Sequence, residues 1–130
     1  MGTIDHIYAK DAPIPIAPFS HACAAGNFAF LTGQMPIDPK TNKIVDGDIE
    51  IQTRRVMDNL NIVLSEMGLS FADVVSARAF LTDMDEYEVF NETYRSFFTP
   101  SALPARTCIG VVALALGAKV EVDFIAYRQS

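Results

Sequence analysis

The apolar residues in the middle of the chain recur at helical spacing. Those that share one helix face are Val56, Leu60, Val63, Leu64 and Met67. Asp48 precedes this stripe and can accept hydrogen bonds from the first free NH groups of a helix, while Gly68 follows it as a C-terminal cap. The pattern predicts a helix from about Ile49 to Met67.

A second helical pattern begins at Asp85. Its apolar positions are Tyr87, Phe90, Tyr94 and Phe97. Pro100 disfavours helical backbone in the residue before it, so this helix is expected to end there.

Shorter apolar runs on either side of these helices predict strands. The runs are Ala22–Ala25, Phe28–Thr32, Val74–Leu81, Ala105–Val112 and Lys119–Tyr127. Gly26-Asn27 suits a tight hairpin turn between the first two runs, and a Gly-containing turn is expected between the last two. The order ββ(β)αβαββ predicts an α+β domain in which the two helices pack on one face of the sheet.

The two last strands carry charged residues on one side. Side chains alternate along a strand, so Arg106 and Cys108 share a side, and Glu121 shares one with Asp123 and Ile125. If the more apolar row of each strand meets the helices, Arg106, Cys108 and Glu121 all project from the helix-free face. A charged yet apolar face on so hydrophobic a chain is a candidate for burial against another subunit.

Composition places the chain among globular proteins, with one domain expected over residues 1–130. Half of the residues are hydrophobic, yet no run approaches the ~20 apolar residues that a membrane span needs, so no membrane association is expected. The first ten residues have the pattern of neither a secretory signal nor a transit peptide. A cytoplasmic location is therefore expected.

Charge and cysteine content exclude further classes. Sixteen acidic and ten basic residues give a net charge of −6 without any cluster of Lys or Arg, which argues against a nucleic-acid partner. Cys23 and Cys108 lie far apart, and the two histidines, His6 and His21, complete no set of metal ligands with them. No metal site is expected.

Several short motifs together resemble the RidA/YjgF family of reactive-intermediate deaminases. In the family's order, they are Gly26-Asn27, Thr32-Gly33-Gln34, Asn91-Glu92-Thr93-Tyr94 with Phe97-Phe98, Leu103-Pro104-Ala105-Arg106-Thr107-Cys108, and Lys119-Val120-Glu121-Val122. The resemblance covers nearly the whole chain. It implies a chorismate-mutase-like (YjgF-type) fold with a mixed sheet, assembled as a homotrimer with an active-site cleft at each subunit interface. It also implies cofactor-free hydrolysis of 2-imino and 2-enamino acids to 2-keto acids and ammonia.

The resemblance assigns the chemistry to two charged residues. Arg106 is expected to grip the substrate carboxylate, because a guanidinium offers a planar fork matched to two carboxylate oxygens. Glu121 matches the family acid that positions the attacking water and protonates the departing nitrogen. The residues themselves leave two alternatives open. Arg106 can instead form a structural ion pair with Glu121 or Asp123, and Asp123 can exchange roles with Glu121.

The resemblance also implies a set of pocket residues. Cys108 is expected to form a pocket wall, because no histidine stands where it would activate a nucleophile. Gly33 is expected to let the ligand approach the backbone, and Thr32 and Asn91 match cleft residues; turn geometry or helix packing is the alternative for each of the three. Phe19 stands where the best-known members carry Tyr. It keeps the aromatic ring but removes a hydroxyl, which allows a different or bulkier substrate.

Three further functions compete with general imine hydrolysis. A deaminase dedicated to one catabolic intermediate, such as 2-aminomuconate, uses the same family scaffold. A protein that binds small carboxylates without turnover would require Arg106 but not Glu121, so the presence of both residues favours hydrolysis. A ribonuclease role, attached to some family members, is disfavoured by the acidic charge.

Overall fold

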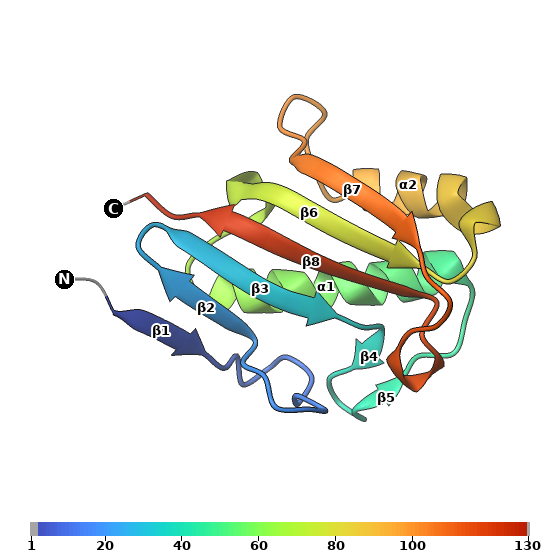
Figure 1. Cartoon of the computed structure of the whole chain (residues 1–130), viewed down its shortest axis with the longest axis horizontal. Helices are drawn as coiled ribbons and strands as arrows, with labels where there is room; N and C mark the ends of the chain where they lie inside the picture. The colour runs from blue at the N-terminus through green and yellow to red at the C-terminus, as the bar shows by residue number, and fades with distance from the viewer. Residues whose placement is uncertain (1–2, 130) are drawn as a thin grey trace.

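A six-stranded sheet forms the centre of the protein in the computed structural model, which describes residues 3–129 (Figure 1). Its strands are β1 (Ile4–Ile7), β2 (Ala22–Ala25), β3 (Phe28–Gln34), β6 (Val74–Leu81), β7 (Ala105–Gly110) and β8 (Val120–Tyr127). They lie in the order β1-β2-β3-β8-β6-β7, with β6 parallel to β7 and every other neighbouring pair antiparallel. A separate two-stranded ribbon pairs β4 (Ile37–Asp38) with β5 (Lys43–Ile44).

Two helices, α1 (Ile49–Glu66) and α2 (Tyr87–Arg95), cover one face of this sheet (Figure 1). The N-terminus of α1 is capped as predicted, because the Ile51 amide donates a 3.0 Å hydrogen bond to the Asp48 carboxylate. Gly68 follows the helix with a φ of +71°, a left-handed conformation that glycine adopts without strain. The predicted α+β architecture, a mixed sheet with two helices on one face, is therefore confirmed.

The hydrophobic core lies between α1 and the central strands. The predicted stripe residues Val56, Leu60, Val63 and Leu64 are fully buried. They belong to one core cluster with Val120, Val122 and Phe124 of β8, and burial of each such side chain contributes roughly 1.5–3 kcal/mol.

The second helix is shorter than predicted. A 3₁₀ turn, η2 (Met84–Glu86), leads into it, and α2 ends at Arg95 rather than near Pro100. The Ser96 hydroxyl donates to the Thr93 carbonyl, and the Phe98 amide donates to the Arg95 carbonyl, so tight turns replace the helix before the proline is reached. These turns place Phe98 against the ring of Phe124 in the core.

Two features of the sheet differ from the prediction. Strand β1 was not foreseen, because three of its four residues are exposed and leave no alternation of apolar and polar positions. The strands β7 and β8 are not joined by a turn as neighbours. Instead β6 lies between them, and a longer connection containing the 3₁₀ segment η3 (Ala115–Gly117) leads from one to the other.

The expected placement of Arg106 and Cys108 on the helix-free face is wrong. Both pair across the parallel ladder with buried residues of β6, Arg106 with Ala77 and Cys108 with Ala79, so both lie on the helix-covered side. Glu121 pairs with Phe80 and does lie on the helix-free side. The assumption that the more apolar side of each strand meets the helices fails for β7, because β7 is an edge strand. The side that carries Arg106 packs against α2, while the more apolar side, which carries Ile109, is left exposed.

Candidate active site

One half of the candidate site is centred on Glu121, where β8 runs beside the end of β3. The Glu121 carboxyl lies against the backbone of Gly33, and among the described residues it receives no hydrogen bond. Burial raises the pKa of Glu121 above its ordinary value, and the negative charge of Asp123 raises it further. A partly buried carboxyl with a raised pKa is suited to both accept and return a proton.

The close approach of Glu121 requires the glycine at position 33. The β3–β8 ladder shifts register between Leu31 and Gln34, which brings the Gly33 backbone toward the acid. A Cβ atom at this position would overlap the Glu121 carboxylate. Thr32 is held beside it, since its amide donates a 3.0 Å hydrogen bond to the His21 carbonyl.

We predict that Gly33→Ala moves the Glu121 carboxyl and lowers turnover roughly 10- to 100-fold, while changing thermal stability little, because only the end of a flexible side chain is displaced. Steady-state kinetics and thermal unfolding measure the two effects. Gly110→Ala is the matched control, since its Cβ would crowd the side chain of Met84 and leave Glu121 in place. Unchanged turnover in Gly33→Ala would mean that the position of this carboxyl is not used.

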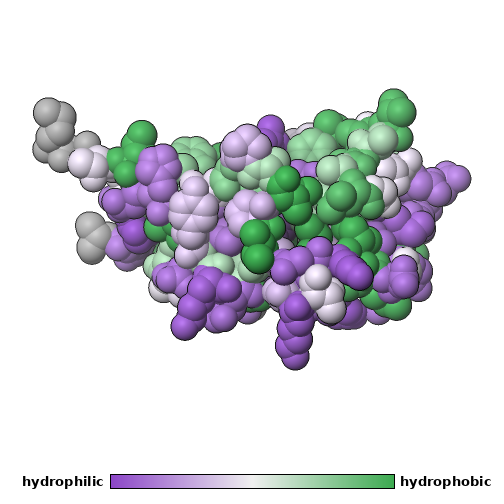
Figure 2. Space-filling model, turned by 90° about the horizontal axis from the view of Figure 1, so that it is seen from below, coloured by the Kyte–Doolittle hydropathy of each residue, from purple (hydrophilic) through white to green (hydrophobic). Residues whose placement is uncertain are grey.

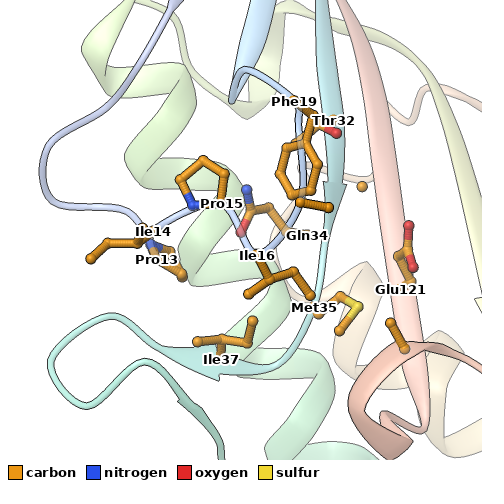
Figure 3. Close-up of a pocket in the computed structure, with 13 residues that line it drawn as sticks. Pro13, Ile14, Pro15, Ile16, Phe19, Thr32, Gln34, Met35, Ile37 and Glu121 are labelled. Carbon is orange, nitrogen blue, oxygen red and sulfur yellow. The ribbon is translucent and has the colours of Figure 1, made fainter.

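A cavity of about 270 Å³ adjoins Glu121 on the helix-free side (Figure 3). Phe19, Thr32 and Gly33 line it together with Glu121, so the structure brings these four predicted site residues into one pocket. The other walls come from the segment 13–17, from Gln34, Met35 and Ile37, and from Ala115 of η3.

The other half of the candidate site surrounds Arg106, at the edge of the sheet beside α2. Its guanidinium lies 5.0–5.7 Å from the ring centroids of Tyr87, Phe90 and Tyr94, and it donates a 3.1 Å hydrogen bond to the Tyr87 hydroxyl. These aromatic faces hold the cation without neutralising it. No carboxylate in residues 3–129 forms a salt bridge with Arg106, so its charge is free for a ligand.

A cavity of about 220 Å³ opens in front of Arg106. Its walls are Asn91, Tyr94, Arg95, Leu103, Pro104 and Arg106. Of the predicted pocket residues, Asn91 therefore accompanies Arg106, and Cys108 lies two residues farther along the same side of β7.

Cys108 does not have the surroundings of an activated thiol, and its role as a pocket wall stays a prediction. Burial raises the pKa of the Cys108 thiol, and the nearby Arg106 charge only partly opposes that effect. The neutral thiol packs against the hydrophobic core.

Tyr94 is a functional candidate that the sequence pattern concealed. Its side chain is 5% exposed and its hydroxyl has no hydrogen-bond partner among the described residues, as is also true of the Asn91 amide oxygen. Burial raises the pKa of Tyr94 to about 12, so its hydroxyl keeps its proton; the residue lines the Arg106 cavity, while the hydroxyl oxygen itself is closed off from solvent. Its place on the apolar stripe of α2 favoured a role in the core. The only feature of the sequence that favoured a polar contact was its hydroxyl group.

Arg106 and Glu121 do not meet within one chain, because they project from opposite faces of the sheet. The structural ion pair between Arg106 and Glu121 or Asp123 is therefore not formed. Asp123 binds Arg78 instead, through hydrogen bonds of 3.1 and 2.7 Å to its two carboxylate oxygens.

The helix-free face carries large apolar side chains that the chain itself leaves uncovered. Phe28, Phe30 and Ile109 are 44–48% exposed, and Tyr127 packs edge-to-face on Phe28 beside them. Figure 2, which views the molecule from below, shows hydrophobic side chains gathered also on the right, at the end of the molecule where β4 and β5 lie in Figure 1. Such surface is typical of a face that another protein covers.

No helix among the described residues is long and apolar enough to cross a membrane. Within residues 3–129, no three His, Cys, Asp or Glu side chains gather in a geometry that would hold a metal ion.

Comparisons with known proteins extend over nearly the whole chain. Residues 9–128 match the family model described as endoribonuclease L-PSP. A RutC family protein of Pyrococcus horikoshii is 43% identical over 123 residues, which cover 95% of this chain and 97% of the relative. The 2-iminobutanoate/2-iminopropanoate deaminase of Escherichia coli is 34% identical over 125 residues, which cover 95% of this chain and 97% of that enzyme.

Solved structures match equally well. The YjgF gene product of E. coli superposes with a TM-score of 0.89 at 32% identity, covering 96% of this chain and 99% of that one. E. coli TdcF, whose structure contains bound serine, gives a TM-score of 0.89 at 30% identity, covering 96% of this chain and 99% of that one.

Proposed function

The chain belongs to the endoribonuclease L-PSP family, which includes the RidA, YjgF and RutC proteins, and we propose that it hydrolyses 2-imino and 2-enamino acids to 2-keto acids and ammonia. The proposed active form is a homotrimer with its catalytic sites between subunits. No cofactor takes part in this reaction.

The placement of Arg106 and Glu121 on opposite faces of the sheet is the observation that carries this proposal. Neither half-site is sufficient alone, since one holds an unpaired cation and the other a carboxyl with a raised pKa. A second copy that packs on the helix-free face can bring its edge strand β7, with Arg106, to the cavity beside Glu121. The uncovered Phe28, Phe30 and Ile109 supply apolar area for that contact.

In the proposed complex, Arg106 of one subunit binds the substrate carboxylate. The guanidinium forms two parallel hydrogen bonds to the two oxygens, while the aromatic rings of α2 fix its plane. The Tyr94 ring, over which the guanidinium lies, belongs to the wall of the same cavity. The 2-keto acid product keeps this carboxylate, so it binds in the same orientation.

Glu121 of the neighbouring subunit transfers the protons in the proposed reaction. Its carboxylate takes a proton from water as the water oxygen bonds to the iminium carbon, which gives a neutral carbinolamine. The acid then returns the proton to the amino nitrogen, and the C–N bond breaks so that ammonia leaves with the bonding electrons. The departing ammonia takes the hydroxyl proton, which leaves the 2-keto acid and an ammonium ion. The raised pKa of Glu121 suits this cycle, because it brings proton uptake and release closer to neutral pH.

Two alternatives fit the molecule less well. Binding of carboxylates without turnover would leave the partly buried Glu121 carboxyl, with its raised pKa, without a role. Ribonuclease activity would require phosphate contacts, and a net charge of −6 disfavours them. Dedication to a single catabolic intermediate remains within the same reaction class.

The experiment that tests this function generates 2-iminobutanoate and 2-iminopropanoate in situ with an amino-acid oxidase and follows their decay with and without the protein. Faster formation of the 2-keto acid and ammonia is expected. An unchanged decay of both imines would contradict the proposal.

A further inference from the structure

We propose that the cavity beside Glu121 receives the side chain of the substrate and selects 2-imino acids with large apolar side chains; this inference rests on the proposed function. The cavity extends from Glu121 and Gly33 beneath the segment 13–19. In Figure 3, Glu121 lies on one side of the view and Pro13 and Ile14 on the other.

The walls of this cavity are mostly apolar. The apolar lining consists of Pro13, Ile14, Pro15, Ile16, Ala17, Phe19, Met35, Ile37 and Ala115. Glu121 is the single charged side chain in the lining, and Thr32 and Gln34 are the only other polar ones. A carboxylate or an ammonium group is therefore disfavoured in the cavity away from Glu121, whereas a hydrocarbon group is favoured.

The bonding of the substrate leaves its side chain as the group that enters the cavity beside Glu121. The reacting carbon carries a carboxylate, a nitrogen and a side chain, and the first belongs at Arg106 of the neighbouring subunit. Nitrogen must stay within hydrogen-bond reach of Glu121 to receive its proton. The side chain is the remaining substituent, and the apolar cavity of about 270 Å³ adjoins the same acid.

His21 fixes the segment that forms the outer wall. The residue is 3% exposed, and its ring Nδ1 accepts a 2.8 Å hydrogen bond from the Ala9 amide. The proton of the neutral ring is then on Nε2, which donates to the Pro13 carbonyl at 2.7 Å. In the same segment, the Ile14 amide donates a 3.1 Å hydrogen bond to the side-chain oxygen of Asn42. The cavity is thus preformed, which keeps the entropy cost of binding low.

Phe19 completes the apolar character of the wall. A tyrosine in its place would add a hydroxyl to the lining, and the phenylalanine adds none. In so apolar a cavity, each methylene added to the substrate is expected to raise kcat/KM roughly fourfold until the space is filled.

The test compares imines made in situ from alanine, 2-aminobutyrate, leucine and phenylalanine. For the wild-type protein, kcat/KM is expected to be at least roughly tenfold higher for the leucine-derived imine than for the alanine-derived one. Ile16→Asn makes the wall polar and should reduce this preference severalfold. Ile51→Asn, at an exposed position on α1 outside the cavity, is the matched control and should leave the preference unchanged.

Calorimetry with the 2-keto acids 2-oxopropanoate and 4-methyl-2-oxopentanoate separates the subsite from the reaction. Tighter binding of the larger acid, weakened by Ile16→Asn, is expected whether or not the protein turns over imines. Hydrolysis of all four imines at equal efficiency, with equal affinity for both keto acids, would overturn the subsite and leave the proposed function standing. Preferential binding without hydrolysis of any imine would overturn the proposed function alone.

Discussion

Replacing Arg106 with alanine is expected to lower kcat/KM for every 2-imino acid by roughly 10² to 10⁴. The change removes two hydrogen bonds to a charged carboxylate, each worth about 1.5–3 kcal/mol. The other arginine that lines the cavity, Arg95, is paired with Glu92 and does not replace them. Affinity for 2-keto acids should fall by a similar factor, because the product keeps the carboxylate. Steady-state kinetics and calorimetry measure the two losses.

Two variants serve as controls for Arg106. Arg106→Lys keeps the charge but loses the planar fork and its stacking on Tyr94, so it should recover only a small part of the activity. Arg54→Ala removes an exposed arginine of α1 that pairs with Glu50, and its kinetics should match those of the wild type. Full affinity for 2-keto acids in Arg106→Ala would assign this residue to structure alone.

Glu121→Gln is expected to lower kcat roughly 10² to 10⁴, with a much smaller change in ligand affinity. The amide keeps the size of the side chain and cannot accept the proton of the attacking water. The ionised form of Glu121 starts the reaction, so wild-type kcat/KM should fall as the pH drops through its raised pKa. Glu121→Gln should not show this acid limb in its residual activity.

Asp123→Asn is the matched control, because both acids lie on the same side of β8. Asp123 is held by two hydrogen bonds from Arg78, whereas Glu121 faces Gly33 and the cavity, so Glu121 should be the acid whose loss stops turnover. An inactive Asp123→Asn beside a normal Glu121→Gln would exchange the two assignments.

The helices and strands that bury one apolar side in the core were predictable from the sequence. The stripe from Val56 to Leu64 defined α1, and a run of β-branched and apolar residues defined β6 with its observed bounds. Gly26 marked the hairpin turn, and the structure places it at a φ of +59°. Strand β1 escaped prediction because exposed residues on both of its sides leave no periodic signal.

The placement of Arg106 and Glu121 on opposite faces of the sheet was not predictable, because it depends on the order of the strands. A turn between the last two strands would make them neighbours, but β6 separates them and pairs in parallel with β7. The side on which Arg106 projects then follows from the packing of an edge strand against the rings of α2. The resemblance to the family assigned the chemistry to Arg106 and Glu121 together, but only the register shows that they face opposite ways.

The most direct test of the shared site mixes two inactive variants. Arg106→Ala and Glu121→Gln are combined in equal amounts, by co-expression or by joint unfolding and refolding, and the oligomers are isolated by size exclusion with light scattering. In a closed ring, a site works only when one neighbour supplies Arg106 and the other supplies Glu121. Random mixing should therefore restore about one quarter of the wild-type activity in a trimer. Mixed trimers that stay as inactive as either parent would contradict a catalytic site built from two copies of the chain.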